Sequence, residues 1–147
     1  MILGIDPGRD KAGWALTDPM GKLLLSGIFP MERSEPFFSC FSSGNTERLL
    51  ACALEKRILP DGIRPSLCVV GNGTGRERIL FFVSRAPFPS IVVPEQGTTL
   101  QARSLYWELH PPRGIWRLVP RTLRTPPRDV DDLAAWAIVL RHLQSIT

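Results

Sequence analysis

Short apolar runs separated by turn residues fill the beginning of the chain. Residues 2–5 are apolar and stop at Asp6, which opens an Asp-Pro-Gly turn, and further runs follow at 12–17 and 22–28. Apolar runs of this length between turn signals are typical of strands. The pattern predicts a buried first strand joined to an antiparallel hairpin.

The remainder alternates helical and strand patterns, apart from residues 30–44, whose Pro, Ser and Phe show no period and which we interpret as a loop. Because helices separate the later strands, these strands must run parallel to the first. The pattern predicts an α/β fold, a mixed five-stranded sheet with helices on both faces. The predicted helices cover 45–58, 79–83, 98–106 and 130–144, the later strands 66–70 and 91–93, and an extended, proline-interrupted segment 111–127.

Composition sets the class of protein. A chain of 147 residues with 44% hydrophobic and 22% charged residues predicts a single domain spanning 1–147. No apolar run approaches the roughly 20 residues of a membrane span, and the first is too short for a signal peptide. The three cysteines, Cys40, Cys52 and Cys68, are odd in number and widely spaced. Free thiols in a reducing, cytoplasmic compartment are the expectation.

Acidic residues follow two predicted strands and begin the last helix. Asp6 ends the first strand, Glu95 follows the last, and Asp129, Asp131 and Asp132 lie at the helix start. The carboxyl ends of parallel strands meet at one edge of the sheet. Carboxylates gathered there repel one another unless a cation neutralises them, and oxygen ligands suit Mg²⁺ or Mn²⁺. Taken singly, each acid has another interpretation: an Asx turn, a loop carboxylate, or helix capping.

The basic residues are mostly arginines. The net charge is +4, with 15 Arg against three Lys, and residues 109–128 contain no acid. Such a tract favours a polyanionic partner, although a solvated loop would have the same composition. The predicted nucleic-acid contacts are Lys11, Arg113, Arg117, Arg121 and Arg124.

Three short motifs, in this order, resemble the RNase H-like nuclease superfamily on the branch of the RuvC resolvases and the YqgF (RuvX) nucleases. Residues 2–8, Ile-Leu-Gly-Ile-Asp-Pro-Gly, are similar to both families and closest to RuvC. Residues 95–99, followed by Ala102, resemble the Asp-Glu-Arg-x-Thr-Thr-x-x-Ala segment of YqgF, and residues 130–135 resemble that family's closing Val-Asp-x-x-Ala-Ala helix start. The resemblance implies an RNase H-like fold over nearly the whole chain.

The resemblance also implies an activity: a divalent-metal-dependent endonuclease with Asp6, Glu95 and Asp131 as metal ligands. Asp131 is preferred to Asp132 because its Asp-x-Leu-Ala spacing matches both families; Asp132 is kept as a further catalytic candidate and Asp129 in reserve. RuvC implies cleavage of branched DNA, and YqgF implies processing of ribosomal RNA precursor. A resolvase that cuts two strands symmetrically implies a homodimer.

The sequence departs from both families near the middle acid. RuvC carries that acid after the fourth strand, where this chain has Gly71-Asn72-Gly73, and Pro94 and Gln96 replace the Asp and Arg that flank the YqgF glutamate. These departures favour the alternative, a catalytically inactive nucleic-acid-binding module. The glycines of 71–75 fit either a phosphate-binding loop or, preferably, a tight strand-to-helix turn.

Overall fold

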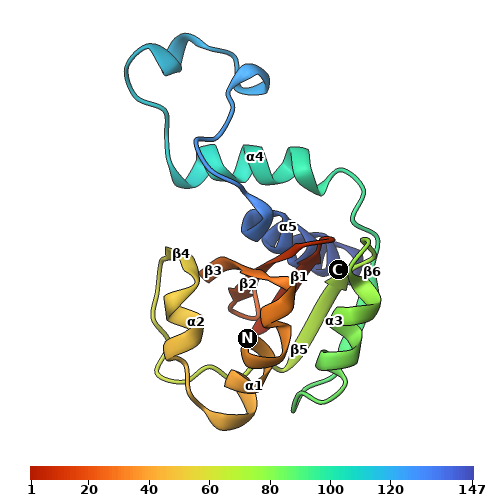
Figure 1. Ribbon diagram of the computed structural model, residues 1–147. Coiled ribbons are helices and arrows are strands. Elements are labelled where there is room, and N and C mark those ends of the chain that lie inside the picture. Colours follow the sequence, from red (N-terminus) through yellow and green to blue (C-terminus); the bar gives the residue numbers. More distant parts are fainter.

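The first strand lies inside a six-stranded sheet of order β4-β3-β2-β1-β5-β6 (Figure 1). The computed structural model describes residues 1–147, apart from the side chain of Thr122. β1, β2, β3 and β4 pair antiparallel, whereas β5 and β6 continue parallel to β1, as the sequence predicts. The strands are β1 Ile2–Pro7, β2 Lys11–Thr17, β3 Leu23–Pro30, β4 Ala53–Lys56, β5 Leu67–Gly71 and β6 Ser90–Val93.

The sixth strand corrects the prediction of five. The predicted helix over 45–58 is limited to α2, Glu47–Ala51, and the chain then pairs with β3 as β4. The backbone of Cys52 crosses Gly27 of β3 so closely that a side chain at Gly27 would overlap it. Pairing with β3 at the edge of the sheet therefore determines the structure of this segment, although the apolar spacing of its sequence favours a helix.

Residues 30–44 are helical, which corrects the prediction of a loop. A single turn, η1 Met31–Arg33, leads into α1, Ser34–Ser43. Pro36 lies in the first turn of α1, where the missing amide costs no helical hydrogen bond. Phe37 and Phe38 are buried, and the ring of Phe37 stacks on Phe29 with centroids 4.1 Å apart. Burial of these rings stabilises a helix that serine-rich composition does not favour.

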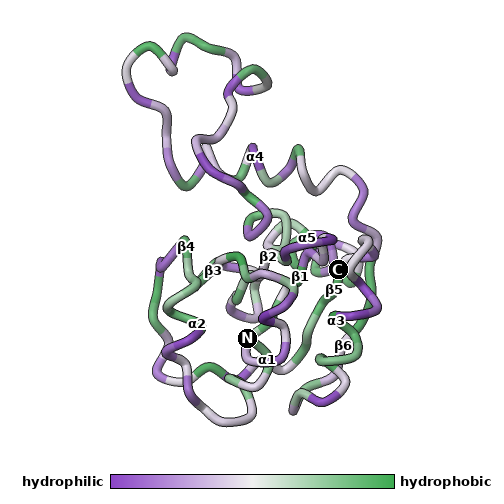
Figure 2. Tube along the Cα trace, in the orientation of Figure 1, coloured by the Kyte–Doolittle hydropathy of each residue, from purple (hydrophilic) through white to green (hydrophobic). Residues whose placement is uncertain are grey.

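Helices cover both faces of the sheet, as predicted (Figure 1). α1, α2 and α3 (Arg76–Val83) share one hydrophobic core with Leu3 and Ile5 of β1, and α5 (Asp131–Ser145) packs on the opposite face. α4 (Thr98–Leu109) lies on α5 rather than on the sheet. Figure 2 shows that apolar residues concentrate along the strands and α5, which together form the core.

An arm formed by residues 111–127 connects α4 to α5 and projects from the body of the molecule (Figure 1). It is extended and proline-interrupted, as predicted, with two single turns, η2 Gly114–Leu118 and η3 Arg121–Leu123. Its exposed residues include both arginines and large apolar side chains. None of the helices in the described residues, in the arm or outside it, is long and apolar enough to cross a membrane.

Candidate active site

The start of α5 lies directly against the end of β1, through a glycine. Asp6 of β1 pairs with Gly13 of β2, and a side chain at Gly13 would overlap the backbone of Asp131 and Asp132. Only glycine lets the helix approach this closely. The contact brings the first residue of α5, Asp131, to the strand end that carries Asp6.

The carboxylate of Glu95 folds back over Gly71, which ends β5, and Gly73, which follows it. A side chain at Gly71 or Gly73 would collide with the Glu95 oxygens, and Gly73 also approaches the Pro7 carbonyl. Asn72 Oδ1 accepts a hydrogen bond from the Glu95 amide at 3.2 Å. The glycines therefore form a tight strand-to-helix turn that leaves room for a carboxylate. Asn72, which stands where RuvC would carry an acid, instead holds the Glu95 backbone in place.

Asp6, Glu95 and Asp131 meet at this edge and perturb one another. Burial, followed by the charge of Glu95, a hydrogen bond with Glu95 and the charge of Asp131, raises the pKa of Asp6 to about 7. The structure thus brings together the three carboxylates that the resemblance selects. Two adjacent carboxylates cannot both be charged without cost, so the neighbouring Glu95 favours the protonated form of Asp6.

Two carboxylate oxygens at this edge are buried and poorly paired. Glu95 Oε2 accepts no hydrogen bond within the described structure, and Asp131 Oδ2 has only the Lys11 ammonium beside it. A buried anionic oxygen without a donor is costly, and a divalent cation would remove that cost. Across the part of the chain that the structure describes, however, no three Asp, Glu, His or Cys side chains already form a ready ligand set. The donor chemistry fits a hard cation, and the carboxylates would have to close around it.

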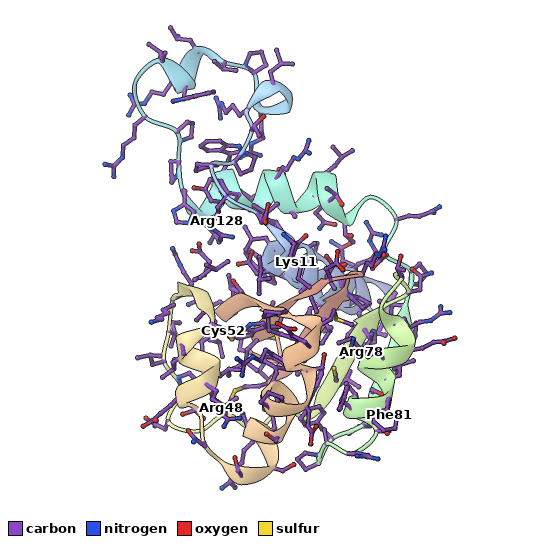
Figure 3. The ribbon with its side chains drawn as sticks, viewed as in Figure 1. Lys11, Arg48, Cys52, Arg78, Phe81 and Arg128 are labelled. Atoms are coloured by element: carbon purple, nitrogen blue, oxygen red, sulfur yellow. The ribbon has the colours of Figure 1, made fainter. Side chains whose placement is uncertain are left out.

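Lys11 occupies the position next to Asp131. Its Nζ lies 3.2 Å from Asp131 Oδ2 and forms a second, closer ion pair with the exposed Asp129. Figure 3 shows Lys11 close to the start of α5. Lys11 therefore neutralises part of the acidic edge. Its predicted role as a nucleic-acid contact competes with these two carboxylates.

Asp132 belongs to a different, buried network, so the structure does not bring this catalytic candidate to the other three acids. Ser26 Oγ donates to its Oδ2 at 2.6 Å, and Arg128 Nη1 donates to its Oδ1 at 2.8 Å. Arg128 also donates to Glu55 Oε2 at 2.8 Å, and His110 Nε2 lies 2.9 Å from the same oxygen. Asp132 fixes the start of α5 to β3 instead of pointing to the site.

The sequence interpretation did not identify Glu55, which holds both ends of the arm. His110 precedes the arm, and Arg128 follows it. Burial alone would raise the pKa of Glu55, but hydrogen bonds from His110 and Arg128 lower it below its ordinary value. In the sequence, Glu55 is a single acid within the apolar stripe of the helix predicted at 45–58. Because that prediction placed it on a helix and not on a strand, the pattern did not indicate its role.

Two shallow hollows flank Asp131. One has a volume of about 230 Å³ and is lined by Asp6 and by the turn 8–11, including Arg9; the other, of about 400 Å³, lies between Arg103 of α4 and the end of the arm. Each hollow therefore carries an arginine beside the carboxylates. Anionic ligands can approach Asp131 from either side.

The arm arginines divide into two groups. Arg124 donates to the Val119 carbonyl at 2.7 Å and Arg121 to Ser104 of α4 at 3.2 Å, so both help to hold the arm. Arg113 and Arg117 are exposed, and their side chains make no hydrogen bond or ion pair with any described residue. Of the predicted phosphate contacts, these two are the most available.

No model of a known protein family matches the chain, and no curated protein matches its sequence significantly. The chain is similar to a solved structure titled "T. thermophilus RuvC in complex with Holliday junction substrate", at a TM-score of 0.52 and 16% identity. That similarity covers 99% of this chain and 93% of the other.

A second solved structure, titled "Thermus thermophilus RuvC structure", agrees with a TM-score of 0.50 and 17% identity, over 97% of this chain and 92% of that one. At this identity the similarity shows the fold. The predicted RNase H-like fold, of the RuvC kind and extending over nearly the whole chain, is confirmed.

Proposed function

We propose that this chain is a divalent-metal-dependent endonuclease that hydrolyses phosphodiester bonds in structured nucleic acid. One observation carries the proposal: Asp6 of β1, Glu95 of the β6–α4 loop and Asp131 of α5 converge on one sheet edge, where Glu95 Oε2 is buried without a hydrogen-bond donor and the buried Asp131 Oδ2 faces only the Lys11 ammonium. Carboxylates gathered with so little compensating positive charge are expensive to maintain for structure alone. It is typical of a site that binds a cation.

Asp6, Glu95 and Asp131 would hold the ion. A bound Mg²⁺ or Mn²⁺ activates water and stabilises the leaving oxygen in phosphodiester hydrolysis. Around it, Asn72 orients the Glu95 backbone, and Lys11 restrains Asp131 through an ion pair. Arg9 and Arg103, on the two sides of Asp131, would hold phosphates beside the reacting bond.

Branched DNA is the first substrate to test, because one of the similar RuvC structures is described with a Holliday junction. Arg113 and Arg117 on the arm would contact phosphates away from the cleaved bond, which adds affinity without sequence preference. Structured RNA is the second substrate class, by the likeness of residues 95–99 to YqgF.

The test is cleavage of a four-way DNA junction and of a structured RNA with Mg²⁺ or Mn²⁺. Wild type should cleave one of them, Asp6→Asn should not, and Asp61→Asn, an exposed acid in a distant turn, should behave as wild type. Divalent ions should also raise the melting temperature of wild type more than that of Asp6→Asn. If wild type cleaves neither substrate and shows no ion-dependent stabilisation, the nuclease proposal fails.

A second candidate is a nucleic-acid-binding module without catalysis. It is favoured by the Lys11 ammonium beside Asp131, which occupies space next to a ligand of the proposed ion. Binding of the junction with no cleavage by wild type or by Lys11→Ala would support this module. Cleavage that appears in Lys11→Ala alone would mean that Lys11 inhibits the site.

A further inference from the structure

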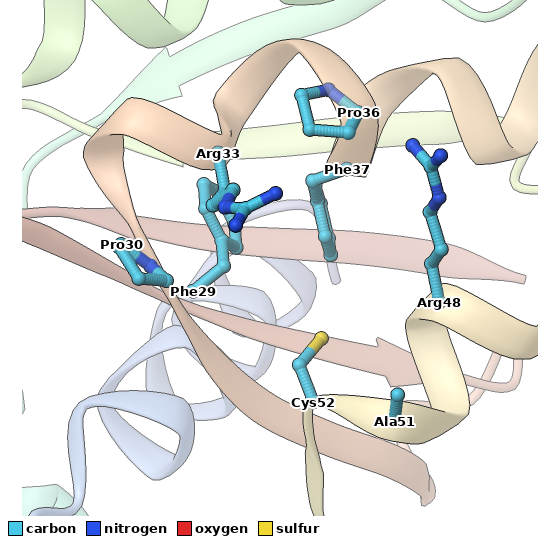
Figure 4. A pocket seen from close by; sticks show the side chains of 8 residues that line it. All are labelled: Phe29, Pro30, Arg33, Pro36, Phe37, Arg48, Ala51 and Cys52. Atoms are coloured by element: carbon cyan, nitrogen blue, oxygen red, sulfur yellow. The ribbon is translucent and has the colours of Figure 1, made fainter.

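A pocket of about 370 Å³ opens on the α1–α2 side of the sheet, apart from the carboxylate site (Figure 4). Its apolar lining comes from Phe29 and Pro30 of β3 and from Pro36 and Phe37 of α1. Ala51 and Cys52 close it at the end of α2. The volume and the aromatic lining suit a flat, apolar ring.

Two arginines stand at this pocket without anionic partners. Figure 4 shows Arg33 and Arg48 on either side of Phe37, with the Cys52 thiol pointing toward them. Both arginines are exposed, and neither forms an ion pair with a described residue. Guanidinium groups of this kind bind phosphate oxygens and also stack on planar rings. A ring with phosphates attached therefore matches the pocket in both shape and charge.

The pocket lies at the same edge of the sheet as the carboxylates. Pro30, in its lining, pairs with Lys11, and Lys11 contacts Asp131. The β3 end is two strands from the end of β1, a separation of about 10 Å. A nucleic-acid strand that reaches Asp6 can therefore pass over this edge and present a neighbouring nucleotide to the pocket.

We propose that this pocket binds an unstacked base of the nucleic-acid substrate, while Arg33 and Arg48 bind the phosphates on either side of it. The inference takes its ligand class from the proposed function. Bases at branch points and in single strands are the least costly to unstack, so the pocket would favour structured substrates over uniform duplex.

The first test measures binding without divalent ions, so cleavage plays no part. A ten-nucleotide single-stranded oligothymidylate is compared with an abasic strand of equal length. Wild type should bind the base-bearing strand roughly ten-fold more tightly. Ala51→Trp, which fills the pocket from an exposed position, should lose that preference, whereas Leu54→Trp, exposed on β4 outside the pocket, should keep it.

The arginines are tested by the salt dependence of the same binding. Arg33→Ala and Arg48→Ala should each reduce the slope of log affinity against log salt by about 0.7. Arg78→Ala, an exposed arginine on α3 (Figure 3), is the control and should leave the slope unchanged.

Cys52 provides a readout that does not depend on a variant. It lines the pocket, whereas Cys40 and Cys68 are buried, so alkylation measured by peptide mass spectrometry can follow this thiol separately. The base-bearing strand should slow alkylation of Cys52, and the abasic strand should not.

Equal affinity for the two strands, or unprotected Cys52, would overturn the inference. So would an Ala51→Trp variant whose self-association changes while its base preference persists, because the pocket would then hold a second copy of the chain. If the protein cleaves nucleic acid but shows no preference for the base-bearing strand, the base-pocket inference fails and the nuclease proposal stands. If it prefers the base-bearing strand but cleaves neither substrate, the nuclease proposal fails and the base-pocket inference stands.

Discussion

Asp131 and Asp132 are adjacent in sequence and have opposite surroundings. One helical residue turns the side chain by about 100°, which directs Asp131 to the sheet edge and Asp132 into the core. The buried Oδ2 of Asp131 faces only the Lys11 ammonium, at 3.2 Å, whereas both Asp132 oxygens are satisfied by Ser26 and Arg128. The first arrangement is suited to a ligand and the second to stability.

Asp132→Asn should therefore destabilise the fold. The amide cannot accept both contacts from Arg128, and Glu55 would be the one carboxylate still paired with Arg128 in this network, so the free energy of unfolding should fall by about 2–4 kcal/mol. Asp131→Asn should change it by less than about 1 kcal/mol. Urea unfolding of the two variants measures the difference. Equal losses would contradict the assignment of Asp132 to the structural network.

Asp6 should make stability depend on pH. Because its pKa is about 7 in the folded protein and near 3.8 when unfolded, the folded state binds more protons between these values. Stability is then lost as pH rises from about 4 to about 7, and Asp6→Asn removes this loss. Without divalent ions, the variant should be more stable than wild type by about 1–3 kcal/mol at pH 8 and equal to it near pH 4. Urea unfolding across this range, compared between the two proteins, checks the prediction.

At the scale of elements, the position of α5 depends on glycines in the strands beneath it. Gly13→Ala should force the helix start away from β2, because the new methyl group meets backbone atoms of Asp131 and Asp132 that cannot rotate away. The expected loss of stability is about 3 kcal/mol or more. Gly62→Ala, whose methyl group would meet open space, is the matched control for thermal unfolding. A Gly13→Ala melting temperature equal to that of Gly62→Ala would argue against this contact.

The arm should contribute to nucleic-acid affinity through its unpaired arginines. Arg113→Ala and Arg117→Ala should each reduce the salt slope of duplex binding by about one unit while leaving stability unchanged. Arg124→Ala should instead loosen the arm, because its guanidinium binds the Val119 carbonyl. Fluorescence anisotropy at several salt concentrations separates these effects. Unchanged slopes for Arg113→Ala and Arg117→Ala would exclude the arm as a phosphate contact.

The sequence predicts those elements whose pattern of apolar and polar residues fits only one type of secondary structure. The apolar strand ending at Asp6, the parallel strands and the final apolar helix are all confirmed. β4 was missed because Ala53 and Leu54 continue the helical spacing of Leu49 and Leu50, and only the exposed edge of β3 selects a strand there. α1 was missed because packing of its phenylalanines, rather than its propensity, stabilises it.

The candidate site could be predicted as residue types at strand ends but not as contacts. Parallel topology is enough to bring Asp6 and Glu95 to one edge. It cannot show that Lys11 neutralises Asp131 or that Glu55, fifty-five residues from His110, holds both ends of the arm. Such pairings depend on side-chain directions across different elements, which periodicity does not encode.

At the scale of the whole molecule, one edge of the sheet carries both the carboxylates and the proposed base pocket, and the arm projects beyond α4 on the α5 side (Figure 1). Each chain has one such edge and therefore one carboxylate site. Symmetric cleavage of two strands at a four-way junction requires two such sites, and the simplest arrangement that supplies them is a two-fold pair of identical chains.

We therefore predict that two copies of the chain bind one junction. Asp6→Asn, which should bind without cleaving, can be mixed with a four-way DNA junction and with a duplex of the same arm length. Sedimentation or mass photometry should find two chains on the junction, and the second should bind more tightly than the first, because the two-fold arrangement places it beside its partner. The duplex should show independent binding with no preferred stoichiometry. A single chain on the junction at saturating protein concentration would count against symmetric resolution and would favour a structured RNA, which needs only one cut, as the substrate.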